Sequence, residues 1–382
     1  MTASRRRGST DRRKPTYTTN QRGGVWGILP RSPPLSLAMQ TKPLPVLIAS
    51  WLDQRHVDRI RAVEPHRIEV LYAPDLLPLP RYEADHHAPR RELSPDDLDR
   101  WRAMAGRAVV SFEFDWDRPT ELLRRAPDLR WVQSTSSGIG PQLVRLGLAG
   151  SPLVVTNAAG IHAQPLAEFV LMAVLHFAKD VPRLTAWKAE RRWQRYCGRE
   201  VSGSRMLVIG LGKVGRRIAE LSSALGIEVV GHRRSQGPLS PGVSRLIDAG
   251  GIDDELPEID YVVLAAPDTP ETRNLLSRSR LAMLPARAVV INVGRGSLID
   301  EPALIERLAD GKIRGAALDV VAQEPLSADS PLWDLPNVII SPHSASTVAQ
   351  ENDRLVDLFV ENLRRFIHGR ELVNVFDHRE LS

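Results

Sequence analysis

The stretch Met206-Leu207-Val208-Ile209-Gly210-Leu211-Gly212-Lys213-Val214-Gly215-Arg216-Arg217-Ile218-Ala219 decides the fold. Its first four residues are apolar and predict a buried strand, and the residues after Gly212 have the apolar spacing of a helix. Between them, three glycines follow the pattern G-x-G-x-x-G. Gly210 permits a tight turn, Gly212 lets the backbone approach a pyrophosphate, and Gly215 lets the helix pack against the strand. The alternative is a glycine turn that only packs a helix onto a sheet.

A strand–turn–helix context favours dinucleotide binding over plain packing. The free amides and the dipole at the start of the helix favour an anion such as a pyrophosphate. We therefore predict a cofactor-binding turn formed by Gly210, Leu211, Gly212, Lys213, Val214 and Gly215.

Strands and helices alternate on both sides of this turn. Apolar runs at 205–209, 227–231, 260–264, 288–293, 315–320 and 337–342 predict one parallel sheet, and runs at 45–50, 68–72, 108–112, 129–134 and 153–156 predict another. We expect a loop over 74–97 and helices at 53–63, 120–125 and 352–368. The last helix most simply returns to the first sheet. The fold class is thus α/β, with two Rossmann-like domains.

The domain limits follow from this order. We expect a discontinuous substrate domain, 41–155 plus 347–382, with the dinucleotide-binding domain inserted as 156–346. The predicted helix 163–179 is apolar over most of its circumference and should be buried. It packs between domains or across a homodimer interface, or it is an ordinary core helix.

Composition narrows the class of protein. Hydrophobic content of 42% and charged content of 25% are typical of a globular chain, and no apolar run is long enough for a membrane helix. Cys197 is the only cysteine, which excludes an intrachain disulfide and a cysteine-based zinc site and fits a reducing cytoplasm. No metal site is evident.

The net charge of +5 comes from one end of the chain. Residues 1–40 carry eight basic side chains and one acid, whereas the remainder carries 43 basic and 45 acidic side chains. This segment is rich in Ser, Thr, Gly and Pro, so we expect a disordered basic tail. We do not expect nucleic acid or a membrane as a partner.

Three residues that can do chemistry follow three successive predicted strands. Arg295 follows 288–293, Glu324 follows 315–320, and His343 follows 337–342. Because the carboxyl ends of parallel strands meet at one edge of a sheet, a cation, a carboxylate and an imidazole are expected at one site. Each of them alone is more often a surface or structural residue. Together, after a dinucleotide turn, they predict proton transfer beside an anionic substrate.

The second strand of the glycine unit ends at His232-Arg233-Arg234. NAD-binding folds usually have an acid there that bonds the ribose hydroxyls. Two arginines suit a 2′-phosphate instead, so we expect NADP as the preferred cofactor with NAD possible. The alternative is that both arginines are solvated and merely tolerate NAD.

With these motifs the chain resembles the D-isomer-specific 2-hydroxyacid dehydrogenases over about residues 45–375. The resemblance rests on VIGLGKVG, NVGRG, GAALDVVAQEPL and SPH. It implies two Rossmann-like domains and catalytic roles for Arg295, Glu324 and His343, with Asp319 near the nicotinamide carboxamide. It also implies a homodimer.

The resemblance suggests further binding residues. The loop after strand 129–134 is similar to a carboxylate-binding loop, which implies substrate contacts from Ser137, Gly138 and Ile139. An ordinary Ser/Gly turn is the alternative. The cofactor is expected to contact Ala266, Pro267, Thr272, Asn292, Val293, Gly294, Asp319 and His343. We expect His86 and His87 to be a solvated pair rather than a lid, and Trp193 and Cys197 to pack.

These parts predict an oxidoreductase. Its expected reaction is hydride transfer between NAD(P)H and a small 2-keto acid, as in glyoxylate or hydroxypyruvate reductases. Two alternatives stay open. One is a phosphoglycerate dehydrogenase-like enzyme, and the other is a dinucleotide-sensing, corepressor-like protein without turnover.

Overall fold

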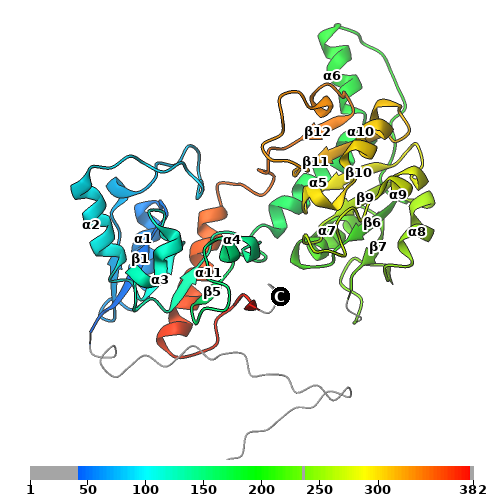
Figure 1. Ribbon diagram of the computed structural model, residues 1–382. Helices are drawn as coiled ribbons and strands as arrows, with labels where there is room; N and C mark the ends of the chain where they lie inside the picture. The colour runs from blue at the N-terminus through cyan, green and yellow to red at the C-terminus, as the bar shows by residue number, and fades with distance from the viewer. Residues whose placement is uncertain (1–41, 235–236, 379–382) are drawn as a thin grey trace, which may run out of the picture.

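The computed structural model describes residues 42–234 and 237–378, which form two α/β lobes (Figure 1). We call residues 42–156 with 351–378 the first lobe and residues 163–340 the second lobe. Each lobe has one parallel sheet covered by helices. The predicted fold class is confirmed, while the tail predicted for residues 1–40 lies outside the described residues.

The sheet of the first lobe has the order β2-β1-β3-β4-β5. Its strands are β1 (Leu44–Ile48), β2 (Ile68–Leu71), β3 (Val110–Phe112), β4 (Trp131–Gln133) and β5 (Val154–Thr156). Apolar residues of α1 (Gln54–Arg61) and α11 (Glu351–Ile367) cover one face. Those of α2 (Pro95–Ala105), α3 (Leu122–Arg125) and α4 (Gly140–Arg145) cover the other.

The sheet of the second lobe has the order β12-β11-β10-β9-β6-β7-β8. Its strands are β6 (Arg205–Ile209), β7 (Glu228–His232), β8 (Arg245–Ile247), β9 (Tyr261–Leu264), β10 (Val289–Asn292), β11 (Gly315–Leu318) and β12 (Val338–Ile340). Because β6 begins the series at the centre of the sheet, the strand order switches direction beside it. Ligands of such sheets bind at this switch point.

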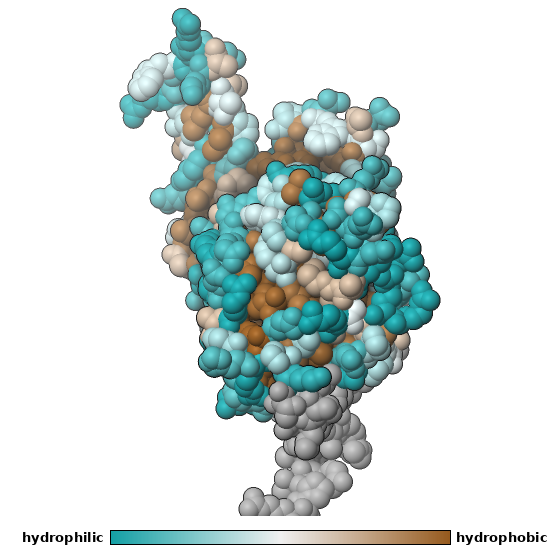
Figure 2. All heavy atoms as spheres, turned by 90° about the vertical axis from the view of Figure 1, so that its left-hand side faces the viewer, coloured by the Kyte–Doolittle hydropathy of each residue, from teal (hydrophilic) through white to brown (hydrophobic). Residues whose placement is uncertain are grey.

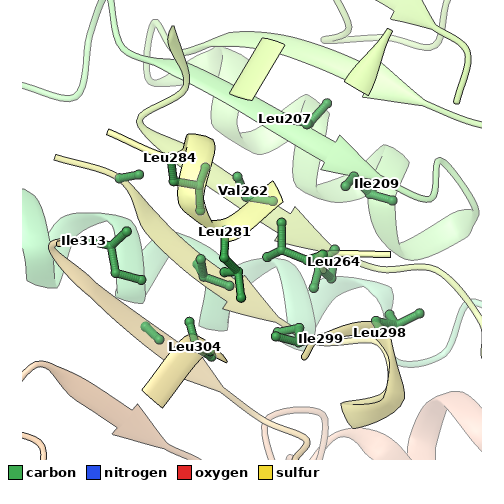
Figure 3. Packing of buried hydrophobic residues seen from close by; sticks show 14 of the residues in the cluster. Leu207, Ile209, Val262, Leu264, Leu281, Leu284, Leu298, Ile299, Leu304 and Ile313 are labelled. Carbon is green, nitrogen blue, oxygen red and sulfur yellow. The ribbon is translucent and has the colours of Figure 1, made fainter. Parts of the chain in front are cut away.

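Helices cover both faces of this second sheet. Helices α5 (Ala163–Ala178) and α7 (Lys213–Ala224) lie on one face, and α8 (Ile252–Glu255), α9 (Arg278–Met283) and α10 (Glu301–Ala309) lie on the other. Figure 3 shows how Leu207 and Ile209 of β6 and Val262 and Leu264 of β9 point into the same apolar layer as Leu281. Alternate residues of these strands face the opposite layer, as both-sided burial of a parallel sheet requires.

Two segments of chain connect the lobes. The first runs from β5 to α5, and the second runs from β12 to α11, whose side chains pack into the first lobe. Phe359 of α11 stacks on Trp131 of β4 with ring centroids 5.1 Å apart. The predicted return of the last helix therefore agrees with its packing, while the domain limits themselves stay a prediction.

Helix α2 was not predicted from the sequence. The hydroxyl of Ser94 accepts a hydrogen bond from the amide of Asp97, and Pro95 occupies the first helical position. Both are ordinary start signals of a helix. The expected loop over 74–97 therefore overlaps the start of this helix, and Trp101 on α2 is fully buried.

An arm projects from the second lobe. Helix α6 (Val181–Ala189) contains no buried residue and stands clear of the rest of the chain, at the top of Figures 1 and 2. The segment after it holds Trp193, which is 100% exposed, and Cys197, which is an exposed free thiol. The expectation that these two residues pack is therefore wrong within this chain, since the arm has no core to receive them.

Candidate active site

A cleft of about 580 Å³ lies between the two lobes. Its wall on the second lobe includes the glycine turn and the ends of β9, β10 and β11, and its wall on the first lobe includes the loop after β4. The polar side chains that line it are described below. Most of them come from the carboxyl end of a strand or from a segment connecting the lobes, while His86 comes from the loop between β2 and α2.

His343 lies in the cleft with a carboxylate behind it. Its Nδ1 is 2.8 Å from Oε2 of Glu324. Glu324 is itself oriented by the amide of Val321, which donates to its Oε1 at 3.4 Å. Two anchors on Asp319 fix the loop that carries the imidazole: the His343 amide donates to the Asp319 carbonyl oxygen, and the Ala345 amide donates to its carboxylate, both at 2.8 Å.

Arg295 also lines the cleft, and the end of β10 orients it. The Nδ2 of Asn292 donates to the Arg295 carbonyl oxygen at 2.9 Å, and the Gly294 amide donates to the Asn292 Oδ1 at 3.1 Å. The guanidinium reaches the opposite lobe, because a Cβ added to Gly138 would collide with Nη2 of Arg295. The cation and the Ser/Gly loop therefore face one another.

A buried acid supports that Ser/Gly loop. Glu113 has a left-handed backbone with φ of 70°. Its Oε2 accepts from the amide and the hydroxyl of Thr135, at 2.7 and 2.6 Å, and its Oε1 accepts from the amide of Phe114 at 3.0 Å. Ser137 and Gly138 line the cleft next to it, whereas the Ile139 side chain is buried in the first lobe.

In the glycine turn, Gly212 has open space beside it, whereas Gly210 and Gly215 are tightly packed. Gly210 has φ of 102°, which other residues rarely adopt, and a Cβ on Gly215 would lie 2.0 Å from the Gly210 carbonyl oxygen. A Cβ on Gly212 would meet no atom within 4 Å, and Gly212 lies at the cleft. No described side chain caps the start of α7, so its amides are available to a pyrophosphate.

Lys213 links this turn to the first lobe. Its Nζ donates to the Ala159 carbonyl oxygen at 3.1 Å and to Oδ1 of Asn374 at 2.7 Å. Burial, with a contribution from Arg216, lowers the pKa of this ammonium. A bound pyrophosphate would add negative charge beside it and favour the charged form.

The other predicted cofactor residues fall into two groups. Val214, Ala266, Pro267, Val293, Gly294 and Asp319 line the cleft. Leu211, Thr272 and Asn292 are buried behind it. Thr272 donates to the Pro267 carbonyl oxygen at 2.7 Å, so it braces the loop that lines the cleft.

His232, Arg233 and Arg234 lie at the end of β7, beyond the cleft lining. His232 is buried, and this burial together with Arg280 lowers its pKa. Arg233 donates to the Pro238 carbonyl oxygen at 3.0 Å, while the exposed Arg234 lies 3.9 Å from Glu271. Arg234 is therefore the less constrained of the two cations.

Three cleft residues were missed or misjudged from the sequence. His86 is not a solvated side chain: its Nδ1 is 2.8 Å from the Ser50 hydroxyl and its Nε2 is 2.8 Å from Oδ1 of Asn352. Burial lowers its pKa. His162 and Glu351 form a second His–carboxylate pair at 3.1 Å. Their partners lie far along the chain, so no local pattern indicates them.

Fold and site define a class of protein: an oxidoreductase that uses a nicotinamide dinucleotide. Residues 171–345 match the family model described as D-isomer specific 2-hydroxyacid dehydrogenase, NAD binding domain. A glyoxylate reductase of Aeropyrum pernix is 32% identical over 265 residues, covering 65% of this chain and 77% of that protein. A D-3-phosphoglycerate dehydrogenase of Mycobacterium tuberculosis is 32% identical over 260 residues, covering 67% of this chain but only 49% of that protein.

Solved structures agree with these relatives. A D-isomer specific 2-hydroxyacid dehydrogenase of Xanthobacter autotrophicus Py2, in complex with NADPH and MES, has a TM-score of 0.69 at 30% identity and covers 89% of this chain and 100% of its own. An NADPH-dependent glyoxylate/hydroxypyruvate reductase of Sinorhizobium meliloti, in complex with NADP and sulfate, has a TM-score of 0.68 at 26% identity and the same two coverages. The chain belongs to the D-isomer specific 2-hydroxyacid dehydrogenase family. The resemblance noted in the sequence is thereby confirmed.

Substitutions of Gly212 and Gly215 should show separately what the glycine turn contributes to NADPH binding and what it contributes to stability. Gly212→Val places a side chain in open space, so we expect an unchanged Tm with NADPH binding weakened about ten-fold or more, because the pyrophosphate loses its place on the backbone. Gly215→Val collides with backbone and should lower both Tm and binding. Thermal unfolding and cofactor titration measure this. Unchanged NADPH affinity in Gly212→Val would contradict the assignment of the turn.

Proposed function

We propose that this protein is an NADPH-dependent reductase that converts a small 2-keto acid, of the glyoxylate or hydroxypyruvate kind, into the D-2-hydroxy acid. One observation carries the proposal. The His343–Glu324 pair, the Arg295 guanidinium and the Ser/Gly loop meet in the cleft that also holds the glycine turn. The similarity to glyoxylate and hydroxypyruvate reductases supports the substrate class.

The nicotinamide, when bound, supplies a hydride to the carbonyl carbon of the substrate. Arg295 binds the substrate carboxylate and stabilises the charge that develops on the carbonyl oxygen. His343 donates the proton to that oxygen from Nε2, because its Nδ1–H donates to Glu324 at 2.8 Å. Glu324 thus fixes the tautomer and stabilises the imidazolium. In the oxidative direction His343 accepts the same proton.

The first lobe supplies the second contact to the substrate carboxylate. The backbone amides of Ser137, Gly138 and Ile139 form a turn that can bind an anion without a charged side chain. This turn is opposite Arg295, which suits a carboxylate held from both sides. A phosphoglycerate dehydrogenase activity is a second candidate because of the 32% identity to such enzymes, although this chain spans about half their length.

His343 should be needed for turnover and not for cofactor binding. His343→Ala removes the proton donor, so we expect kcat to fall about 100-fold or more while the KM for NADPH changes little. The assay follows NADPH oxidation with glyoxylate, hydroxypyruvate and phosphohydroxypyruvate. Glu324→Gln, which keeps a hydrogen-bond acceptor, should lose less activity than His343→Ala. Unchanged turnover in His343→Ala would contradict the role of His343 as the proton donor. If the wild-type protein binds NADPH tightly but turns over none of these keto acids, a dinucleotide-sensing protein is favoured instead.

Arg234 should decide the preference for NADPH. Its guanidinium is exposed and can bind a 2′-phosphate, so Arg234→Ala should lower kcat/KM with NADPH about ten-fold or more and leave the value with NADH nearly unchanged. The matched control is Arg273→Ala, which removes an exposed arginine paired with Asp268 and should change kcat/KM with neither cofactor. Wild-type enzyme that uses NADH as well as NADPH would refute the preference.

Exposed side chains on and near the arm support two further proposals, a homodimer and a location in the cytoplasm. Among large apolar side chains exposed in the described part of the chain, five lie between 172 and 193: Met172, Leu175, Val181, Leu184 and Trp193. Exposed apolar side chains concentrated in one stretch of α5, α6 and the following segment suit a protein interface, and a second copy of the same chain is the simplest partner. The exposed free Cys197 suits a reducing compartment.

The arm variant Leu184→Asp with Trp193→Ser should convert the dimer into a monomer, because it places charge and polarity in the apolar patch. Light scattering after size-exclusion chromatography measures the mass. Leu79→Asp, at an exposed leucine of the first lobe, is the control and should stay dimeric. A monomeric wild type, or a dimer in the arm variant, would contradict this interface.

A further inference from the structure

The cleft contains a second relay of hydrogen-bonding side chains. The Ser137 hydroxyl lies 3.1 Å from Nδ1 of His162, and Nε2 of the same ring lies 3.1 Å from Oε1 of Glu351. All three residues line the cleft. Ser137 is exposed to it, whereas the side chains of His162 and Glu351 are only 16% and 9% exposed.

This relay starts in the loop that faces Arg295. Gly138, whose Cα lies against the Arg295 guanidinium, directly follows Ser137. His162 lies in the segment that connects β5 to α5, and Glu351 is the first residue of α11, where the other connecting segment ends. The relay therefore joins the proposed carboxylate-binding loop to one connecting segment and to the start of α11.

The hydrogen-bond directions follow from the chemistry of the groups. An ionised Glu351 only accepts, so Nε2 of His162 carries a proton. Its Nδ1 then has two choices. In a neutral ring it accepts the Ser137 proton and leaves the hydroxyl oxygen facing the cleft, and in an imidazolium it donates to that oxygen and frees the Ser137 proton.

We propose that His162, held by Glu351, is a positioning residue that makes the Ser137 hydroxyl a donor to the substrate carboxylate; this rests on the proposed function. A carboxylate lies at each end of this relay, Glu351 and the incoming substrate, and this arrangement favours hydrogen bonds that all point from His162 and Ser137 toward the carboxylates. Three other ionisable groups lie near the relay. Arg295 faces the loop, Lys213 binds Ala159 three residues before His162, and His86 bonds to Asn352 beside Glu351.

Glu351 has a further feature that a simple structural bond does not require. Its Oε2 is buried and has no hydrogen-bond partner among the described residues. Among the described residues, His162 is the one side chain that bonds to this carboxylate, so Glu351 acts on the Ser137 hydroxyl through the His162 ring. The pair therefore supplies charge to the Ser137 hydroxyl as well as geometry.

A double-mutant cycle tests the relay. The enzyme saturated with NADPH is titrated with oxamate, a carboxylate that mimics a 2-keto acid and is not reduced. Ser137→Ala and His162→Asn should each weaken oxamate binding about ten-fold, since each removes one charge-assisted hydrogen bond. Because His162 acts through Ser137, the double variant should also lose about ten-fold, not about 100-fold.

Kinetics provide the second measurement. The KM of the keto acid should rise about ten-fold in His162→Asn and in Glu351→Gln, with kcat within about two-fold and the KM for NADPH unchanged. Ser137→Thr, which keeps the hydroxyl, should restore most of the binding lost in Ser137→Ala. His176→Asn, a histidine on α5 outside the cleft, is the matched control.

Additive losses in the cycle would overturn the inference, because His162 would then act on the substrate independently of Ser137. Equal losses of kcat and of NADPH affinity would overturn it as well, since they indicate general loosening of the cleft. If His162→Asn does not fold, the same oxamate cycle is measured with Glu351→Gln in its place, and the same outcomes apply. An inactive wild type would refute the proposed function only, because oxamate binding is read without turnover.

Discussion

The amide of His343 donates a hydrogen bond to the carbonyl oxygen of Asp319, and the Asp319 amide donates to the carbonyl oxygen of Asn292. The ends of β10, β11 and β12 are therefore joined through one residue. Asn292 in turn orients the loop of Arg295. Because every one of these bonds depends on the register of adjacent parallel strands, the spacing of the cation and the imidazole is a property of the sheet. A change in strand register would separate them.

The first lobe completes this site through the two connecting segments. Lys213 of the glycine turn binds Ala159 in one segment and Asn374 near the C-terminal end of the first lobe. The same helix start that favours a pyrophosphate is thereby tied to the opposite lobe. One ammonium thus lies at the predicted pyrophosphate site and at the contact between the lobes.

The sequence predicted those parts whose signal is local. The three glycines, the apolar strands and the residues that follow each strand are readable because strand order alone brings Arg295, Asp319 and His343 to one edge. The relay was not readable, because His162 pairs with Glu351 across 189 positions and His86 with Asn352 across 266. Helix α2 was missed although Ser94 and Pro95 are start signals, since its neighbouring loop is rich in proline and charge. Trp193 was misjudged because aromatic residues usually pack, and this one lies on an arm without a core.

The two His–carboxylate pairs of the cleft have the same chemistry in different surroundings. His343 and Glu324 have side chains 48% and 39% exposed, whereas those of His162 and Glu351 are 16% and 9% exposed. A group that delivers a proton in every turnover must recover it from solvent, which suits the exposed pair. A group that fixes the direction of another hydrogen bond must hold its own proton in place, which suits the shielded pair, since electrostatic effects are screened less there. The two exposures thus fit the two proposed roles, a proton donor for His343 and a positioning residue for His162.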